Sequence, residues 1–349
     1  MTSHSSQPFH PAGQSFLVTG GAGFIGSHIV RRLVADGAKV RVLDVLPVRR
    51  WDNLAGIMDR IELVEGDICD TATVRQAMSG IQYVLHLAAL VSVPQSIDQP
   101  ESNLAVNIRG THNLLVAARD AAVRRLVFSS SCAVYGDHGS PQHEELAPRA
   151  LSPYAAAKLS GEQLCHSFTH VYGLPTVCLR YFNAFGPGQN PFGSYAAVIP
   201  QFIIALLRGK RPKIYGDGRQ VRDFVYVGDI VEANLLACTV EAAVGGLFNV
   251  GTGQETSLLD LLAILEDSLH LKARPIFAPS RAGDIRRSCG DVTRARTTLG
   301  FQPKFGLAEG LRETLHWFRE HGERVWAHSA PVRQTVSARA SLAYVGIRK

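Results

Sequence analysis

A tyrosine and a lysine, Tyr154 and Lys158, lie four residues apart at the start of the segment PYAAAKLSGEQL, which has a helical pattern. Side chains at this spacing project from the same face of a helix, so the phenol and the ammonium are expected to be neighbours. A nearby ammonium favours the phenolate and should lower the pKa of Tyr154 toward neutrality, as a general base requires. Taken alone, such a pair is usually a pair of surface or packing residues.

Three consecutive serines, Ser129 to Ser131, end the upstream segment RLVFSSS, which is predicted to be a strand. Open α/β sheets bind their ligands at the carboxyl ends of the strands. We therefore expect these serines to lie near the helix of Tyr154, where one hydroxyl could share a reacting proton with the phenol. Serines at the end of a strand can equally be ordinary caps.

A glycine-rich turn formed by Gly20, Gly23 and Gly26 connects the predicted strand SFLVTG to the predicted helix FIGSHIVRRLVADG. In this context the first glycine allows a tight turn, the second lets the backbone approach a pyrophosphate, and the third permits close packing of helix on strand. Backbone N–H groups at the start of the helix would face the phosphates. The turn therefore predicts a dinucleotide site, whereas a glycine-rich turn without a ligand is the alternative.

An aspartate, Asp44, ends the next predicted strand, KVRVLD. Its carboxylate could accept hydrogen bonds from both hydroxyls of an adenosine ribose, and it would repel a 2′-phosphate. NAD is therefore favoured over NADP as the cofactor. Arg49 and Arg50 follow closely and weaken that preference slightly, although a solvated pair in a loop is the other interpretation.

The elements that position these residues alternate between short β-branched runs and longer helical patterns, which predicts βαβ units and a parallel sheet. After Gly186 the rhythm changes and a smaller lobe is expected, but FVYVGDIVEANLLACTVEAAVGGLFNV again indicates strand, helix and strand. The prediction is a Rossmann-type, doubly wound α/β sheet with a smaller, interleaved α/β substrate-binding domain. The NAD-binding domain is assigned to 15–190 with a return segment at 224–256, the second domain to 191–223 and 257–322, and weakly ordered tails to 1–14 and 323–349.

The composition of the 349 residues, 46% hydrophobic and 19% charged, allows a substantial core. The start of the chain lacks a signal-peptide pattern and no apolar run is long enough to span a bilayer, so we predict a cytoplasmic protein without a membrane partner. The six cysteines are far apart, with no spacing typical of a metal site. Most of the net charge of +6 lies after Gly322, and basic and aromatic residues do not alternate, so no nucleic-acid partner is predicted.

The order of these motifs resembles the extended short-chain dehydrogenases/reductases over roughly residues 15 to 320. The resemblance is carried by TGGAGFIGSH, the strand-end Asp44, GDI at 66–68, HLAA at 86–89, SSSCAVYG, YAAAK, RYFNAFGP and RDFVYV. It implies Ser131, Tyr154 and Lys158 as the catalytic residues. It also implies a cofactor site formed by Gly20, Gly23, Phe24, Ile25, Gly26, Asp44, Asp67, Ile68, Leu87, Ala88, Ala89, Asn107, Tyr154, Lys158 and Tyr181, with Asp67 and Ile68 at the adenine.

Within that family, the stretch RYFNAFGPGQNPFGSYAAVIPQFI is most similar to UDP-N-acetylglucosamine 4-epimerases, although Gly188 stands where an arginine is common. The nucleotide-sugar dehydratases have an Asp-Glu pair after the catalytic serine or threonine. Here Cys132 and Ala133 occupy those positions, and neither can act as a carboxylate acid or base. The resemblance therefore favours epimerisation over dehydration.

The same resemblance implies a site for a UDP-sugar substrate. Asn183, Arg222 and Arg281 would bind the diphosphate, Tyr215 would pack on the uracil and Asp284 would bind the ribose. Ser288 aligns with a position where 4-epimerases that reject N-acetyl sugars have a tyrosine, so its small side chain predicts room for a 2-acetamido group, unless it is a loop serine without contacts. The full predicted substrate site is Ser92, Ser131, Tyr154, Asn183, Val198, Tyr215, Arg222, Arg281, Asp284 and Ser288.

The resulting functional prediction is NAD-dependent C4 epimerisation of a UDP-hexose, foremost the interconversion of UDP-GlcNAc and UDP-GalNAc through a 4-keto sugar. Two alternatives stay open: a 4-epimerase for UDP-glucose/UDP-galactose or UDP-glucuronate, and a non-catalytic NAD-binding sensor. The resemblance also implies a homodimer formed through the NIRGTHNLL and YAAAK helices of each subunit.

Overall fold

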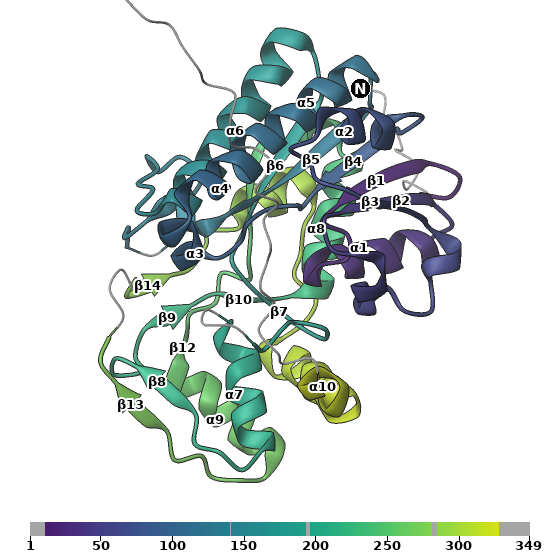
Figure 1. Ribbon diagram of the computed structural model, residues 1–349. Helices are drawn as coiled ribbons and strands as arrows, with labels where there is room; N and C mark the ends of the chain where they lie inside the picture. Colours follow the sequence, from purple (N-terminus) through teal and green to yellow (C-terminus); the bar gives the residue numbers. More distant parts are fainter. Residues whose placement is uncertain (1–10, 140, 193–195, 281–284, 328–349) are drawn as a thin grey trace, which may run out of the picture.

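The computed structural model describes residues 11–139, 141–192, 196–280 and 285–327, with side chains to 322. Its larger lobe is built on a parallel sheet of seven strands in the order β11-β6-β5-β4-β1-β2-β3 (Figure 1). The strands are β1 (Ser15–Thr19), β2 (Lys39–Asp44), β3 (Glu62–Glu65), β4 (Tyr83–His86), β5 (Arg125–Ser131), β6 (Thr176–Tyr181) and β11 (Leu247–Val250). The strand order reverses between β1 and β4, the place where doubly wound sheets bind ligands. The predicted fold class is confirmed.

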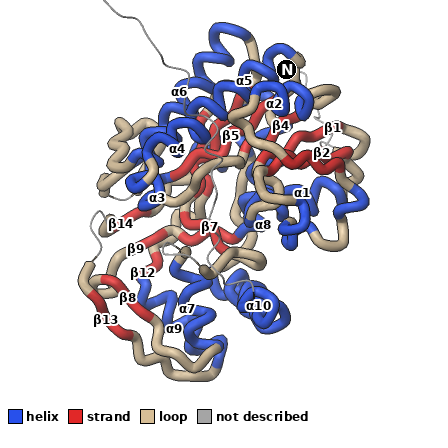
Figure 2. The backbone as a smooth tube through the Cα atoms, in the orientation of Figure 1, coloured by secondary structure: helices blue, strands red, loops and turns tan. Residues whose placement is uncertain are grey.

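Helices cover both faces of this sheet (Figure 2). Along β1, Phe16 and Val18 belong to the core beneath one helical layer and Leu17 belongs to the core on the opposite face, as the two-residue period of a strand requires. The first layer contains α1 (Phe24–Ala35) and α8 (Val227–Thr239), and the second contains α2 (Thr71–Met78), α5 (Thr111–Asp120) and α6 (Pro153–Tyr172). Short helices α3 (Val93–Asp98) and α4 (Pro100–Leu104) lead into a π-helical turn, Ala105–Gly110, ahead of α5.

The smaller lobe has its own apolar core, which contains Phe202, Ile203, Leu261, Leu265 and Leu315. Its helices are α7 (Val198–Leu207), α9 (Leu258–Leu269) and α10 (Leu307–Ala327), and its strands are β8 (Lys213–Tyr215), β9 (Val221–Arg222), β12 (Thr256–Ser257), β13 (Ile276–Ala278) and β14 (Arg287–Ser288). Strand β9 lies between β12 and β14, and β8 pairs with β13. Where the chain passes between the lobes, β7 (Asn183–Phe185) pairs with β10 (Phe224–Tyr226).

Short turns complete the described elements. The 3-10 turns are Val48–Arg50, Asp52–Leu54, Met58–Arg60, Cys132–Tyr135 and Glu241–Ala243, and a second π-helical turn spans Ala295–Leu299. The turn Cys132–Tyr135 follows β5 directly, so it begins at the carboxyl edge of the sheet.

Part of each predicted tail, 1–14 and 323–349, lies within the described structure. Helix α10 continues to Ala327, past the expected boundary at 322, because the same helical pattern continues through that point. Ahead of β1, the Gly13 N–H donates to the Gly37 carbonyl at 3.0 Å, so residues 11–14 are joined to the loop before β2. The return of the chain to the first lobe is visible in β11, which pairs with β6.

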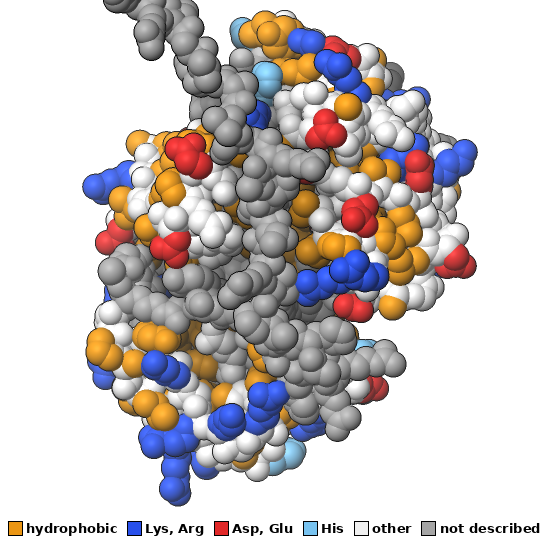
Figure 3. Space-filling model, viewed as in Figure 1, with side chains coloured by type: hydrophobic (Ala, Val, Ile, Leu, Met, Phe, Trp, Pro, Cys, Tyr) orange, Lys and Arg blue, Asp and Glu red, His pale blue; other side chains and the backbone are white. Residues whose placement is uncertain are grey.

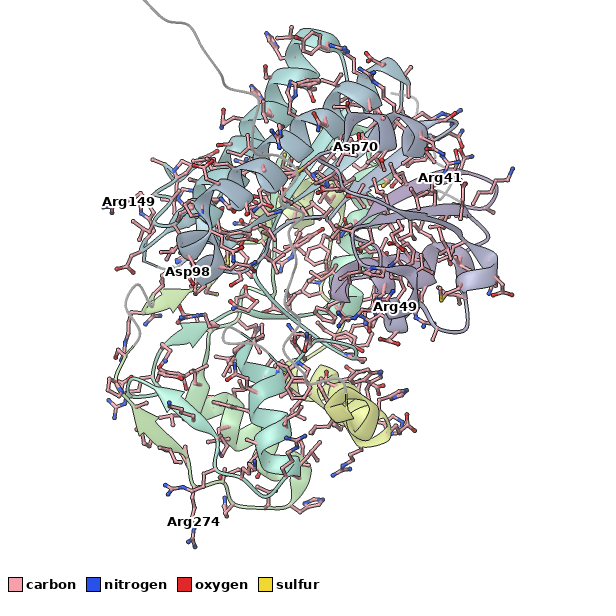
Figure 4. All side chains as sticks on the ribbon, in the orientation of Figure 1. Arg41, Arg49, Asp70, Asp98, Arg149 and Arg274 are labelled. Carbon is pink, nitrogen blue, oxygen red and sulfur yellow. The ribbon has the colours of Figure 1, made fainter. Side chains whose placement is uncertain are left out.

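Basic side chains gather at the end of the smaller lobe far from the central sheet (Figure 3), where Arg274 projects outward (Figure 4). Lys210, Arg211, Lys272 and Arg274 are all exposed there. The Arg211 guanidinium donates to the carbonyls of Arg274 and Pro275 and so joins the segments that precede β8 and β13. Among the described residues, no helix is long and apolar enough to cross a membrane, and no group of three or more His, Cys, Asp or Glu could hold a metal ion.

Candidate active site

The glycine-rich turn leaves the amino end of α1 open to a ligand. Gly20 has a φ of +69°, and a Cβ there would lie 2.7 Å from the Ala88 nitrogen, so the turn must be this tight for the two loops to meet. Gly23 precedes α1 without any side-chain cap. The first N–H groups of the helix can therefore bind a pyrophosphate, as the sequence predicted.

Asp44 lies beside this turn with a 7% exposed surface. One carboxylate oxygen accepts from the Ala22 N–H and the other from the Leu46 N–H, each at 3.0 Å. Burial raises the pKa of Asp44, while these backbone hydrogen bonds oppose the rise. Each oxygen has a further lone pair with which it can accept from a ribose hydroxyl. Arg49, in the loop after β2 (Figure 4), and Arg50 are exposed.

The loop after β4 completes the cofactor side of the site. The Ala88 N–H donates to the Thr19 hydroxyl at 3.3 Å, and the Asn107 amide is bound to both the N–H and the carbonyl of Leu90. Asn107 therefore holds this loop in place with its side chain. Leu87, Ala88 and Ala89 are half-buried along the loop.

At the adenine end of the predicted site, Ile68 is buried and Asp67 is exposed. An Asp67 oxygen accepts from the Cys69 N–H at 2.8 Å. Tyr181 is buried at the end of β6, where its hydroxyl bonds to Ser129 at 2.9 Å and to Asn234 at 3.0 Å. Its hydroxyl is thus committed to contacts within the protein.

Tyr154 and Lys158 lie on the first turns of α6, against the carboxyl end of β5. Ser152 caps this helix and Pro153 is its first residue, an arrangement that fixes where the helix begins. The Lys158 ammonium donates to the Ser129 carbonyl at 2.7 Å and lies 6.0 Å from the centre of the Tyr154 ring. The Ser131 hydroxyl accepts from the Ala133 N–H at 3.2 Å. The structure thus places the three predicted catalytic residues at one edge of the sheet.

The prediction that Lys158 lowers the pKa of Tyr154 toward neutrality is wrong for this structure. Burial raises the pKa of Tyr154 to about 12, and a hydrogen bond with the Ser131 side chain opposes that rise only partly. Burial also lowers the pKa of Lys158 to about 8. For both groups burial is the largest influence on the pKa, and the Lys158 ammonium donates to a backbone carbonyl.

The hydroxyls of Ser129 and Ser130, also on β5, form hydrogen bonds with buried side chains. The Ser130 hydroxyl donates to Glu162, and Glu162 forms a two-point ion pair with Arg180, at 2.8 and 2.7 Å. Both members of this pair are buried. It joins α6 to β6, and no local pattern predicts it because the partners lie 18 residues apart on different elements.

Strands β7, β9 and β14 carry three of the residues predicted to bind the substrate. The Asn183 side-chain oxygen is buried and has no hydrogen-bond partner among the described residues, which leaves it available to a ligand. Arg222 on β9 donates to the carbonyls of Val221 and Ile285. Ser288 on β14 pairs with Arg222 in register, and its side chain contacts Cys132, the neighbour of Ser131.

Of the five other predicted substrate residues, the structure describes three, each on a different element. Ser92 caps α3 by accepting from the Gln95 N–H at 3.1 Å, and Val198 is the first residue of α7. Tyr215 ends β8, with the Lys213 ammonium 4.8 Å from its ring centre. Arg281 and Asp284 lie outside the described residues.

The sequence predicts no role for His86 and Asp223, two buried residues whose hydrogen bonds hold loops near the site. His86 is fully enclosed between the hydroxyls of Thr19 and Thr111, at 2.8 and 2.9 Å. Asp223 accepts from the N–H groups of Thr252 and Gly253 and thereby joins β10 to the loop after β11. The motifs HLAA and RDFVYV contain both residues, but only the fold supplies their partners.

Fold and site together define a Rossmann-type protein with a glycine-rich dinucleotide turn and a tyrosine–lysine pair at the carboxyl edge of its sheet. Residues 16–251 match the NAD dependent epimerase/dehydratase family. The chain is 43% identical over 312 residues to a UDP-glucose 4-epimerase of Mycolicibacterium smegmatis, covering 88% of this chain and 99% of that protein. The chain therefore belongs to this family and is an NAD-dependent enzyme, which confirms the resemblance predicted from its motifs.

Solved structures agree with this assignment. A UDP-N-acetylglucosamine 4-epimerase from Methanobrevibacter ruminantium, in complex with UDP-N-acetylmuramic acid, is 39% identical with a TM-score of 0.85, covering 89% of this chain and 99% of that one. A UDP-glucose 4-epimerase from Thermotoga maritima, with UDP-glucose, is 38% identical with a TM-score of 0.83, covering 88% and 99%.

Proposed function

We propose that this protein is a UDP-sugar 4-epimerase whose principal reaction interconverts UDP-GlcNAc and UDP-GalNAc. The observation that carries the choice of sugar is Ser288, a small, buried residue beside Cys132 at the end of the site that contains Ser131. A small side chain there leaves space for a 2-acetamido group. Cys132 and Ala133 also lack the carboxylates that elimination of water requires, so the reaction stops at epimerisation.

In the proposed reaction Tyr154 is the residue that removes and returns a proton. Its phenolate removes the proton from the sugar O4 as C4 becomes a ketone, and the same phenol returns the proton after the sugar has presented its other face. Ser131 holds O4 beside the phenol, and Lys158 fixes the distance between α6 and β5 through the Ser129 carbonyl. NAD, when bound, would supply a reversible hydride acceptor and a positive charge that favours the phenolate.

The rest of the proposed site retains the nucleotide while the sugar turns. Asn183 offers a buried amide oxygen without a partner in the described part of the chain, and Arg222 supplies a positive charge suited to a diphosphate. Tyr215 offers an aromatic face for the uracil. Arg281 and Asp284 remain proposed ligands of the diphosphate and ribose on the basis of the family resemblance.

A UDP-glucose 4-epimerase is the second candidate, because the Mycolicibacterium relative has that name at 43% identity. The two candidates differ in whether a 2-acetamido group is accepted. The sensor alternative is disfavoured by the Tyr154–Lys158 pair at the sheet edge, which binding of NAD alone does not require.

Conversion of UDP-GlcNAc tests the proposal directly. Purified protein is incubated with UDP-GlcNAc, UDP-glucose or UDP-glucuronate without added cofactor, and the products are separated by chromatography. Formation of UDP-GalNAc at the highest kcat/KM supports the proposal. Turnover of UDP-glucose alone would favour the second candidate, and NAD released on denaturation would show that the cofactor is retained between turnovers.

A homodimer and a cytoplasmic location remain predictions. Exposed apolar side chains on α4 and α6, including Leu104, Val171 and Tyr172, support self-association through this side of the molecule. Light scattering coupled to size-exclusion chromatography measures the mass of the particle, and a monomer across the accessible concentration range would rule the dimer out.

A further inference from the structure

Gln142 is a fully buried polar residue whose backbone bonds to the segment that follows β14. Its N–H donates to the Cys289 carbonyl, and its own carbonyl accepts from the Asp291 N–H, both at 2.8 Å. Its backbone thus holds the segment after β14 on both sides of Gly290. Such full burial of an uncharged amide is tolerated only where its hydrogen bonds are satisfied.

The side chain of Gln142 reaches the residue that the proposed function relies on for sugar choice. The Ser288 hydroxyl donates to the amide oxygen of Gln142 at 3.3 Å. The amide nitrogen of Gln142 donates to the His138 carbonyl, also at 3.3 Å. Both ends of the glutamine are therefore occupied. On its other side Ser288 is held by β9, since the Asp223 N–H donates to the Ser288 carbonyl at 2.9 Å.

A rigid support lies behind Gln142. The Asn249 amide nitrogen donates to the carbonyls of Gln142 and Asp291, at 2.9 and 3.0 Å. Its amide oxygen accepts from the Tyr135 hydroxyl at 2.7 Å, and the Arg180 guanidinium lies 4.5 Å from the Tyr135 ring centre. The glutamine is thus fixed relative to the sheet that bears the proposed catalytic residues.

We propose that Gln142 is a specificity-determining positioning residue that keeps Ser288 turned back into the protein and so keeps space for the 2-acetamido group. This inference rests on the proposed function. If the Gln142–Ser288 hydrogen bond is lost, the serine and its strand are free to move toward the sugar. The larger N-acetyl substrate is affected more than the substrate with a 2-hydroxyl group.

The test compares Gln142→Met, Ser288→Ala and the double variant with the wild type. Methionine keeps the length of the side chain and removes its hydrogen bonds, and alanine removes the same bond from the other end. We expect the ratio of kcat/KM for UDP-GlcNAc over UDP-glucose to fall about tenfold in each single variant, through KM, and no further in the double variant. In Gln142→Met the kcat for UDP-glucose is expected to stay near the wild-type value.

Gln82→Met is the matched control. Gln82 is a partly buried glutamine whose amide oxygen accepts from the Ser15 N–H at the amino end of β4, the opposite edge of the sheet. This variant should leave the substrate ratio unchanged. An equal loss on both sugars in Gln142→Met, an unchanged ratio, or additive effects in the double variant would each overturn the inference.

Titration calorimetry with UDP-GlcNAc, UDP-glucose and UDP separates this inference from the proposed function. Wild-type protein that binds both sugars without converting UDP-GlcNAc refutes the proposed function. In that case the affinity ratio of the two sugars still decides the role of Gln142. The affinity for UDP itself should not change in Gln142→Met, because UDP has no 2-acetamido group.

Discussion

The Lys158 ammonium donates a 2.7 Å hydrogen bond to the carbonyl oxygen of Ser129. This contact joins the first turns of α6 to the carboxyl end of β5, the two elements that supply Tyr154 and Ser131. Lys158 is buried, and the Phe128 ring centre lies 5.0 Å from its nitrogen. Its principal contact therefore sets the geometry of the site.

Replacement of Tyr154 tests its role as the proton carrier. Tyr154→Phe keeps the buried ring and removes the hydroxyl, so kcat should fall at least about 100-fold while the fold is retained. Initial rates with UDP-GlcNAc and thermal unfolding measure the two effects. Tyr172→Phe, at the exposed end of the same helix, serves as the control, and a Tyr154→Phe protein with full turnover would contradict the assignment.

Gly26 tests the dinucleotide turn. A Cβ at this position would lie 2.3 Å from the Gly20 carbonyl oxygen and 2.8 Å from the Gly21 Cα. Gly26→Ala should therefore push the turn and α1 apart and reduce the NAD that is released on denaturation. Gly139→Ala is the control, because a Cβ there meets nothing within 4 Å. Equal NAD content in both variants would show that the turn does not hold the cofactor.

Ser288 tests the space around the sugar. Ser288→Tyr should abolish turnover of UDP-GlcNAc and spare UDP-glucose, because the ring fills the volume proposed for the 2-acetamido group. Steady-state kinetics on the two substrates give the comparison. Equal losses on both would remove the argument from side-chain size.

Because His86 is buried in its neutral form, we expect the protein to lose stability as the pH falls. Burial, with repulsion from Lys158, lowers the pKa of His86 from 6.5 to about 3. Between these values the unfolded chain binds a proton that the folded protein does not, so the free energy of unfolding falls as the pH falls. Above pH 6.5 this contribution is constant. The slope from this group is at most about 1.4 kcal/mol per pH unit.

Urea titrations at several pH values between 5 and 7.5 measure this slope. His86→Asn removes the titrating ring and should flatten the dependence, whereas His166→Asn, on the exposed surface of α6, should leave it unchanged. An identical slope in His86→Asn and the wild type would assign the acid sensitivity to other groups.

The sequence alone determined the fold class, the dinucleotide turn and the positions of Tyr154 and Lys158. These features depend on local spacing: glycines that let a strand turn into a helix, and an i to i+4 pair on one helical face. Helix α10 extends past residue 322, into the segment that the sequence analysis assigns to a tail.

Only the tertiary structure decided how these residues are surrounded. The raised pKa of Tyr154 comes from burial, which residue spacing does not reveal. The contact between Gln142 and Ser288 joins residues 146 positions apart, because β14 returns to the sheet edge from the second lobe. Local patterns specify which elements form, but desolvation and long-range hydrogen bonds arise only when those elements pack together.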